Sequence, residues 1–404
     1  MTETITDARA CPVAFDHAAV HPRRDLLEWG QTLRSDHPIA WSESHGGVWI
    51  VSRHADIQEI ARQPDIFVSG KGITIPPLQS PVPVVPAESD EPEHSHYRAA
   101  LWQFLKPRAV KSYSERIREI IVEALENLLV RGEGDAITGF AAKIPTRAMA
   151  TVFGFSDEDA YRFDHDFGEV VESASSDDVQ RQAAAVSNFF AFLKEKLEEG
   201  RAGKAGDNVV AAILEYEKDG YRFNEDEILG LLWSTAGGAV DTTKHSIGHA
   251  IYNLGIRPEL RKQLIDNPRL ITIAVEENLR MDAPAYMTAR HLVKDAVVGD
   301  VQMRAGDRVM LVYGFGNRDA RAFECPEEFR LDRKANNHLS FGHGIHTCVG
   351  MHLARIEIKI AIEEILARMP EFELVEPVSE PKIRGGLMWA FDSLPIRVGP
   401  VPAA

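Results

Sequence analysis

Residues 341–350 of the chain read FGHGIHTCVG, a short run in which three glycines flank Cys348. Glycine lets the backbone turn tightly and approach a neighbouring group, and a thiolate ligand needs nearby N–H groups free to reach its sulfur. The ten residues that follow, 351–360, have helical periodicity. The sulfur is therefore expected near a helix N-terminus, where the helix dipole favours an anion, and the run predicts a thiolate ligand at Cys348.

The other two cysteines lack such surroundings. Cys11 and Cys325 are interpreted as ordinary small apolar side chains, which is the commoner role of a lone cysteine. Three cysteines form no disulfide framework and indicate a reducing compartment. The first thirty residues contain neither a signal-peptide core nor a membrane anchor, so we expect a cytoplasmic protein.

The composition is that of a folded, acidic protein. Of 404 residues, 44% are hydrophobic and 26% are charged, which suits a chain that buries a sizeable core. The net charge of -16 makes nucleic acid an unexpected partner. No internal repeat is visible, so we predict one domain over residues 1–404, mainly α-helical with small β-sheets, and a loosely ordered tail over residues 1–20.

Local patterns indicate where the elements lie. Residues 39–53 alternate around Gly46-Gly47 and predict a β-hairpin. Apolar residues at three- and four-residue spacing predict mostly helix over residues 93–285. Strand patterns return at residues 293–304, 307–314 and 394–398.

A proline-rich segment separates the hairpin from the helical region. Six prolines interrupt residues 67–92, which excludes regular structure there. Long loops in compact proteins are usually functional or disordered, and this one is rich in apolar residues. We predict a substrate-access loop over residues 68–92 that forms a pocket wall or lid; a plain surface connector is the alternative.

The stretch 225–254 predicts a helix about 45 Å long, at about 1.5 Å per residue. It is apolar on most sides and therefore buried, yet its centre reads AGGAVDTT over residues 236–243. Asp241 and Thr242 are costly in such a position unless they have partners or perform chemistry. The small residues before them would let the helix pass close to a flat ligand and bulge.

The run at 341–350 matches the signature F-x-x-G-x-(R/H)-x-C-x-G at all five fixed positions, and the chain thereby resembles the cytochrome P450 family. The resemblance implies a roughly triangular helical domain with a long central helix over a haem b group. It makes Cys348 the axial ligand of the iron, and it sets His346 against a haem propionate.

Two further sets of residues match the family. Glu277 and Arg280 alone are only an i,i+3 ion-pair pattern, but with Arg333 they match a buried structural triad. Arg290, His94 and Arg98 match the family's positions for propionate contacts. Residues 94 and 98 also lie on one helical face, where a solvated basic face is the alternative.

The resemblance also assigns the polar pair in the long helix. The family has an acid and an alcohol here, preceded by (Ala/Gly)-Gly-x, and this chain has Asp241 and Thr242 after Gly238-Ala239-Val240. The usual second glycine is thus Ala239, which bears on groove width rather than on proton delivery. The pair implies proton delivery to dioxygen as the catalytic role.

The implied activity is a haem-thiolate monooxygenase that inserts one atom of O2 into a small to medium apolar substrate, by hydroxylation or O-dealkylation. No flavin or iron-sulfur domain is fused, so electrons are expected from a separate ferredoxin with its NAD(P)H-dependent reductase, acting on a monomer. The alternatives are a peroxide-driven, coupling or isomerising enzyme on the same haem, and a non-catalytic haem-based binder or gas sensor.

Two surfaces follow from the resemblance. A basic patch formed by Lys106, Arg108, Lys111 and Arg355 is the expected ferredoxin-docking face, although these residues could equally be ordinary solvated charges. Each expected pocket residue taken singly is more often plain core, but the set is apolar and favours a hydrophobic substrate. The expected pocket residues are Ile75, Val84, Phe167, Val171, Ser234, Gly238, Ala285, Met287, Met388 and Trp389.

Overall fold

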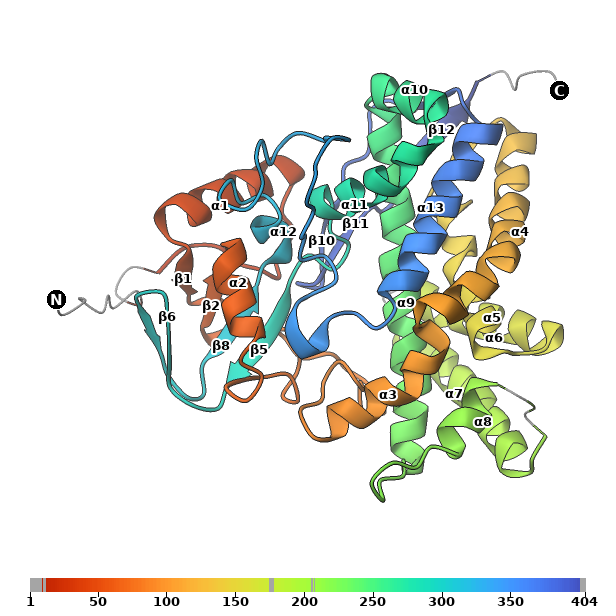
Figure 1. Cartoon of the computed structure of the whole chain (residues 1–404), viewed down its shortest axis with the longest axis horizontal. Helices are drawn as coiled ribbons and strands as arrows, with labels where there is room; N and C mark the ends of the chain where they lie inside the picture. Colours follow the sequence, from red (N-terminus) through yellow and green to blue (C-terminus); the bar gives the residue numbers. More distant parts are fainter. Residues whose placement is uncertain (1–8, 10–11, 174–177, 205, 207, 400–404) are drawn as a thin grey trace.

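The computed structural model describes residues 9, 12–173, 178–204, 206 and 208–399. Cys11 lies outside these residues, as does most of the first half of the tail expected over residues 1–20. Figure 1 shows most helices gathered on one side of the molecule and the larger sheet on the other, with the long helix α9 running through the helical side.

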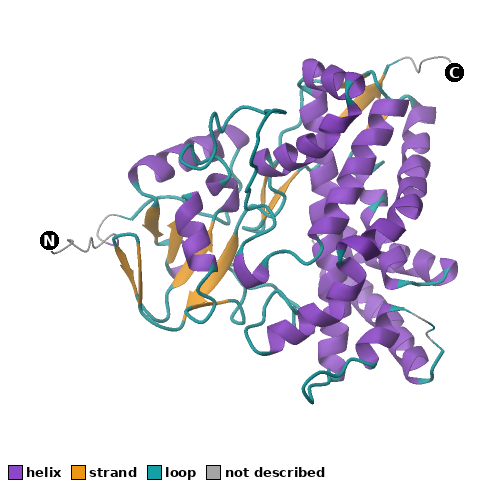
Figure 2. Ribbon diagram, viewed as in Figure 1, coloured by secondary structure: helices purple, strands orange, loops and turns teal. Residues whose placement is uncertain are grey.

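The expectation of a mainly α-helical chain with small sheets is confirmed (Figure 2). The helices are α1 (Arg23–Asp36), α2 (His54–Ala61), α3 (Glu93–Leu105), α4 (Pro107–Arg131), α5 (Pro145–Phe153), α6 (Asp157–Ser173), α7 (Val179–Arg201), α8 (Val209–Leu214), α9 (Glu225–Gly255), α10 (Pro258–Asp266), α11 (Ile271–Met281), α12 (Tyr313–Gly316) and α13 (Met351–Arg368). Short 3-10 turns are η2 (Ser44–Gly46), η3 (Ala141–Lys143), η4 (Pro268–Leu270) and η5 (Gly344–His346). None of the helices in the described ranges has the length and apolarity to cross a bilayer.

The strands form four small sheets. One has five strands in the order β1-β2-β8-β5-β3, one has three in the order β4-β12-β9, and β6-β7 and β10-β11 are pairs. The predicted hairpin is confirmed, because β1 and β2 pair antiparallel with Trp41 opposite Trp49. The strands are β1 (Ile39–Ser42), β2 (Val48–Val51), β3 (Phe67–Val68), β4 (Glu133–Asp135), β5 (Thr288–Leu292), β6 (Ala296–Val298), β7 (Val301–Met303), β8 (Arg308–Leu311), β9 (Phe372–Leu374), β10 (Lys382–Arg384), β11 (Met388–Ala390) and β12 (Pro395–Val398).

Helix α9 begins where its sequence says it should. The Asn224 side chain accepts a hydrogen bond from the Glu227 N–H at 3.0 Å, and the Glu227 carboxylate accepts one from the Asn224 N–H at 2.8 Å. This capping box satisfies two N–H groups that a helix start leaves free. The helix then runs unbroken through the glycines at its centre to Gly255.

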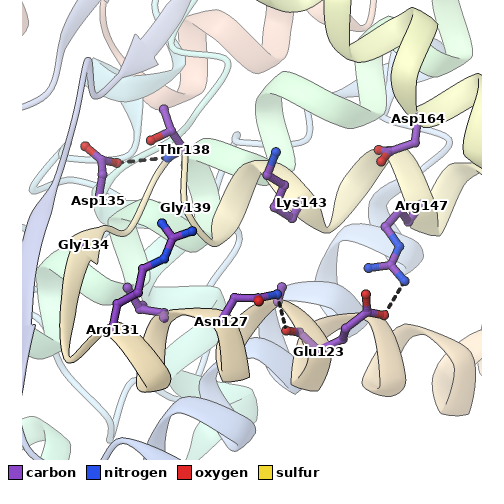
Figure 3. Close-up of a pocket in the computed structure, with 12 residues that line it drawn as sticks. Glu123, Asn127, Arg131, Gly134, Asp135, Thr138, Gly139, Lys143, Arg147 and Asp164 are labelled. Carbon is purple, nitrogen blue, oxygen red and sulfur yellow. Dashed lines mark hydrogen bonds and ion pairs between the residues drawn. The ribbon is translucent and has the colours of Figure 1, made fainter.

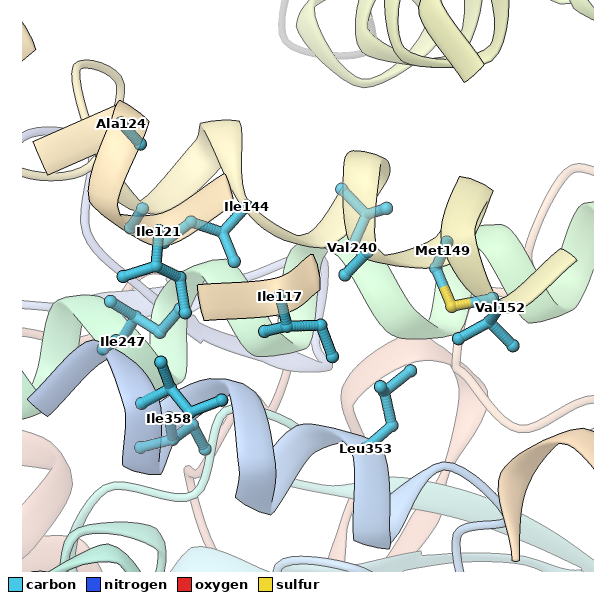
Figure 4. Packing of buried hydrophobic residues seen from close by; sticks show 14 of the residues in the cluster. Ile117, Ile121, Ala124, Ile144, Met149, Val152, Val240, Ile247, Leu353 and Ile358 are labelled. Carbon is cyan, nitrogen blue, oxygen red and sulfur yellow. The ribbon is translucent and has the colours of Figure 1, made fainter. Parts of the chain in front are cut away.

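Four helices pack around the centre of the helical side (Figure 4). Branched apolar side chains interdigitate there and are at most 3% exposed. Because α13 is held against α4 and α9 by this core, the residues just before α13 have a fixed position relative to the middle of α9. The packed side chains include Ile117 and Ile121 of α4, Met149 and Val152 of α5, Val240 and Ile247 of α9, and Leu353 and Ile358 of α13.

The proline-rich segment between β3 and α3 has no helix or strand, as predicted. The Asp90 carboxylate accepts hydrogen bonds from the N–H groups of Ser69 at 2.8 Å and Gly70 at 3.1 Å, which ties the loop's two ends together. Its middle lies on α9: the Ser234 hydroxyl donates to the Val85 carbonyl. The loop is thus ordered by its own acid and by the helix beneath it.

Candidate active site

Cys348 lies between η5 and α13, at the helix N-terminus that the sequence predicted. Its N–H donates to the Phe341 carbonyl at 2.8 Å, which closes the turn. Gly344 has φ +74°, and a Cβ there would lie 2.2 Å from the Ala61 carbonyl oxygen, so the run is pressed against the end of α2 at a point where only glycine fits. The predicted need for glycine is confirmed at this position.

The thiol of Cys348 is accessible, yet protein surrounds it closely. Burial raises the pKa of the thiol, whereas the N–H groups of Gly350 and Met351 and the charges of Arg98 and Arg355 act in the opposite direction. Hydrogen-bond donors and cations around a sulfur are the usual means of stabilising a bound thiolate. The surroundings thus favour the anion once a metal replaces the proton.

Four basic side chains converge beside this turn: His94 and Arg98 of α3, Arg290 of β5 and His346 of η5. The two imidazole rings are 4.3 Å apart. Arg98 donates to the Thr347 carbonyl at 2.6 Å. Burial and the charges of Arg290, His94 and Arg98 lower the pKa of His346 to about 2. The sequence-predicted propionate contacts are therefore brought together.

The described acids compensate the charges of this cluster incompletely. Glu91 faces Nδ1 of His94 at 3.3 Å, while the buried Nε2 atoms of His94 and His346 have no partner in the described protein. Arg290 reaches only its neighbours, the Ala289 carbonyl at 2.6 Å and the Thr288 hydroxyl at 3.3 Å. Buried polar atoms are normally paired, so the cluster fits a ligand that carries carboxylates.

The centre of α9 leaves room for a flat group. Gly237 and Gly238 are exposed in the middle of this otherwise buried helix, and a Cβ on Gly238 would have nothing within 4 Å. Thr242 donates to the Gly238 carbonyl at 2.8 Å. An accessible thiol, an unbalanced basic cluster and an open helix surface fit a haem, with thiolate, propionate and distal contacts supplied by different elements.

Asp241 has a partner that the sequence interpretation missed. The Lys244 ammonium, one turn further along α9, donates to its carboxylate. Burial opposes ionisation of Asp241, but its neighbours, above all the Lys244 ammonium, lower the carboxyl pKa overall. The i,i+3 spacing of residues 241 and 244 was the available signal. His245 is buried, and burial lowers its pKa to about 3.

The predicted triad is assembled and buried. Arg280 donates from two nitrogens to the two carboxylate oxygens of Glu277, both at 2.8 Å, and neither side chain is exposed. Arg333 adds a contact to the same carboxylate at 3.1 Å. Asn336 and the N–H of Arg330 complete its shell, each at 3.0 Å. Although burial raises the pKa of Glu277, these partners lower it overall.

The expected pocket residues divide into two groups. Ile75, Phe167, Met287 and Trp389 are at most 2% exposed and are packed in hydrophobic cores in this conformation. The remaining six keep accessible surface, although the Ser234 hydroxyl is occupied by the Val85 and Gly230 carbonyls. These six are Val84, Val171, Ser234, Gly238, Ala285 and Met388.

The predicted basic patch needs one correction. Lys106, Arg108 and Lys111 are exposed, but Arg355 is not a free surface charge. Its guanidinium donates to the two oxygens of Glu276 at 2.7 and 2.8 Å and lies over the Phe341 ring at 4.5 Å. A bidentate acid partner neutralises it, so it contributes little to an external positive field.

A surface cavity of about 510 Å³ lies elsewhere, between the end of α4 and the segment leading into α5 (Figure 3). It contains none of the predicted site residues. Its charges are largely engaged: Arg147 pairs with Glu123 at 2.6 Å, and Asp135 accepts from the N–H groups of residues 137 and 138 at 2.7 and 3.0 Å. This cavity is therefore separate from the predicted site.

Comparisons with known proteins point to one family. The sequence model described as Cytochrome P450 matches residues 165–398. Cytochrome P450 130 of Mycobacterium tuberculosis is 33% identical over 341 residues, which are 81% of this chain and 83% of that protein. Mycinamicin IV hydroxylase/epoxidase of Micromonospora griseorubida is 30% identical, over 93% of this chain and 96% of that enzyme.

The fold agrees with the sequence comparisons. The crystal structure of CYP109E1 from Bacillus megaterium in complex with testosterone matches with a TM-score of 0.82 and 26% identity, covering 92% of this chain and 99% of that one. The matched length includes both the helical side and the sheets.

Proposed function

Because the chain belongs to the cytochrome P450 family of monooxygenases, we propose that it holds haem b through Cys348 and inserts one oxygen atom from O2 into an apolar organic substrate. The observation that carries this proposal is the accessible Cys348 thiol beside four basic side chains, of which His94 alone contacts an acid, Glu91, in the described protein. A thiolate ligand next to basic side chains that can bind carboxylates suits an iron porphyrin, which carries two propionates.

The chain's residues divide the work of holding the group. Cys348 supplies the thiolate, and the N–H groups that follow it stabilise the anion. Arg98, Arg290, His94 and His346 bind and orient the propionates through charge-assisted hydrogen bonds. When bound, the haem supplies the activation of O2.

Asp241 and Thr242 are proposed to handle protons on the α9 side. The carboxylate of Asp241 takes a proton from water and passes it on, and the Thr242 hydroxyl orients the water that receives it. Thr242 is one turn from the exposed Gly238, whose carbonyl it contacts at 2.8 Å. The pair supports oxygen from O2 over peroxide, because peroxide arrives with its protons already in place.

The substrate is proposed to be a medium-sized apolar molecule. The accessible candidate pocket residues are apolar or small, apart from Ser234, whose hydroxyl is already bonded. Two similar proteins are named for mycinamicin IV and testosterone, which are bulky and largely apolar. A panel of such compounds, tested for the spin-state change that accompanies binding, is the direct measurement; binding confined to small charged compounds would refute the proposed class.

A ferredoxin, reduced by its NAD(P)H-dependent reductase, is proposed as electron donor. Lys106, Arg108 and Lys111 present exposed positive charge beside Trp102, an aromatic side chain that is 42% exposed, on a chain of net charge -16. Charge reversal of Lys106 and Arg108 to Glu should slow reduction by an acidic ferredoxin and remove its salt dependence. An unchanged rate at every salt concentration contradicts this docking face.

The test of the iron ligand is spectroscopic. Wild-type protein, reduced and exposed to carbon monoxide, should give the thiolate-type spectrum. Cys348→His should bind haem without that spectrum, and Cys325→Ser, which alters the other described free cysteine, should retain it. A wild type that lacks the thiolate-type spectrum, or a Cys348→His variant that keeps it, refutes the proposal.

The test of the oxygen source uses Thr242→Ala. With reduced ferredoxin and O2, product per electron should fall, because protons reach the site out of step and reduced oxygen escapes as peroxide. With added peroxide, the same variant should turn over nearly as the wild type does. Wild-type turnover that Thr242→Ala leaves unchanged would favour the peroxide-driven, coupling or isomerising alternatives. Lack of wild-type turnover in both assays would favour a haem-based binder.

A further inference from the structure

Asp241 and Lys244 form an ion pair inside the central helix, directly beside the open surface of α9. Their side chains are 42% and 14% exposed, so the ammonium is mostly removed from water. The comparable pair Lys262 and Asp266 on α10 is 75% and 61% exposed. Exposed i,i+4 pairs contribute little, whereas a mostly buried ammonium depends on its partner. Unlike an exposed lysine on a helix surface, Lys244 therefore depends on Asp241 to compensate its charge.

The charges that act on Asp241 come from two elements. Lys244 and His245 belong to α9, and Arg384 approaches from β10. Arg384 is paired with Asp392, and His245 is buried with a pKa lowered to about 3, which keeps it neutral near pH 7. Lys244 is thus the charge in direct contact with the carboxylate.

We propose that Lys244 is a positioning residue for proton delivery: it holds the Asp241 carboxylate ionised and turned toward residue 244, so that every proton transfer requires the pair to part. The proposal rests on the proton-handling role proposed above for Asp241. One proton moves in each event: the carboxylate takes it from a hydronium ion of the solvent, which is left as water, then releases it to the water beside Thr242 and re-forms its contact with Lys244. No redox change occurs at either residue.

Removal of the ammonium has a defined consequence. Burial by itself raises the Asp241 pKa, and Lys244 is the largest influence that lowers it. Without Lys244, the carboxyl should keep its proton to higher pH. The pH profile of coupling, meaning product formed per electron, should shift in the same alkaline direction.

The experiment compares Lys244→Met, which keeps the aliphatic length, with Lys244→Arg, which keeps the charge. Lys244→Gln accompanies them in case the methionine variant does not fold. Lys262→Met is the control, since it breaks an exposed pair on α10. In each substrate-bound ferric holoenzyme, infrared difference spectra against pH give the Asp241 carboxyl pKa, with Asp241→Asn identifying the band.

Turnover supplies a second measurement, the solvent isotope effect and the coupling at each pH. Lys244→Met and Lys244→Gln should raise the Asp241 pKa, change the isotope effect and shift the coupling profile. Lys244→Arg and Lys262→Met should resemble wild type.

Three other outcomes would each refute a particular part of the proposal. An unchanged Asp241 pKa in both neutral variants refutes the ion pair. A raised pKa with unchanged coupling and isotope effect refutes the positioning role while leaving the pair. If Asp241→Asn itself leaves coupling unchanged, the proposed proton role of Asp241 fails and the positioning role fails with it, whereas the infrared result still decides the pair.

Discussion

Two clusters of charge in this protein differ in how completely the chain satisfies them. In the first, the Glu277 carboxylate receives hydrogen bonds from Arg280, Arg333 and Asn336 and is fully buried. Further N–H groups of Arg280 donate hydrogen bonds to backbone carbonyls, including that of Asn317 at 2.9 Å. The Glu277 carboxylate and the Arg280 guanidinium are thus paired within the chain, although Oδ1 of Asn336 has no partner in the described protein; we call this set the closed network.

The second cluster, His94, Arg98, Arg290 and His346, is open. Its buried imidazole nitrogens lack partners, and its mutual repulsion, with burial, lowers the pKa of His346 to about 2. Like charges gathered with unpaired buried nitrogens fit a ligand that compensates them. The comparison teaches that completeness separates a structural network from a binding site, even where both consist of the same residue types.

The largest effect is expected from breaking the closed network. Glu277→Gln removes the charge that balances Arg280, whose side chain is 0% exposed, and leaves a buried guanidinium without its partner. Loss of one partner of a buried pair costs about 3–5 kcal/mol. We expect a holoenzyme that unfolds at much lower denaturant concentration, or that fails to fold.

The matched control is Glu324→Gln, an acid that is 83% exposed and lies 3.6 Å from Arg330. It should change the free energy of unfolding by less than about 0.5 kcal/mol. Denaturation of both variants followed by far-UV circular dichroism measures the difference. Equal stability of the two variants would mean that the closed network is not a structural element.

The open cluster should respond differently to the loss of a charge. Arg290→Met removes one of several like charges, so the free energy of unfolding of the holoenzyme should fall by no more than the loss of haem affinity. Haem, however, loses a charge-assisted contact worth about 1.5–3 kcal/mol, which is roughly a 10- to 150-fold faster loss. Transfer of haem from the holoenzyme to apomyoglobin measures this rate.

An exposed arginine provides the comparison for Arg290. Arg304→Met, on the turn after β7, should leave the rate of haem loss unchanged. If Arg290→Met also leaves the rate unchanged, the open cluster does not hold propionates. If Arg290→Met lowers the free energy of unfolding as much as Glu277→Gln does, the open cluster is a structural network like the closed one.

Elements with a local signature were predictable from the sequence. The hairpin at residues 39–53 and the start of α9 after Asn224 follow from turn and capping residues within a few positions of each other. The prediction that the proline-rich loop has no helix or strand was correct. Its attachment to α9 through Ser234 was not predictable, because that contact joins residues 149 positions apart.

Site residues show the same limit. The spacing of Glu277 and Arg280 indicated a pair, while its complete burial and the contact from Asn336 depend on the fold. Arg355 was assigned to an external patch, since the sequence gives no sign that Glu276 lies opposite, 79 residues away. The unbroken centre of α9 shows that core packing outweighs the poor helix propensity of its glycines.

Glu276 is a second carboxylate that basic side chains pair within the chain, and its effect on stability should depend on pH. Burial raises its pKa, but hydrogen bonds from His338 and Arg355 lower it to about 2, below the ordinary value of 4.5. Its contribution to stability is therefore present above about pH 4.5 and is lost as the pH falls toward 2. Glu276→Gln should lose that part of the acid sensitivity.

Unfolding free energies of wild type and Glu276→Gln, measured from pH 2 to pH 7, test this sign. The two curves should lie apart at neutral pH and converge as the acid is protonated. Glu324→Gln should run parallel to wild type, because its side chain is mostly in water. Parallel curves for Glu276→Gln would show that its ion pair does not contribute to acid sensitivity.

The smallest effect is expected where a satisfied contact borders the open side of α9. The Ser234 hydroxyl joins the proline-rich loop to the helix through the Val85 carbonyl, and Ser234→Ala removes one neutral hydrogen bond worth about 0.5–1.5 kcal/mol. Because the loss is local, amide hydrogen exchange over residues 82–88 should quicken several-fold with little change in global stability. Ser112 is an exposed residue of α4 whose hydroxyl donates to the Ala109 carbonyl at 2.6 Å. Ser112→Ala should leave exchange in the loop unchanged. Unchanged loop exchange in Ser234→Ala would mean that the acid-tied ends of the loop, through Asp90, hold it without help from α9.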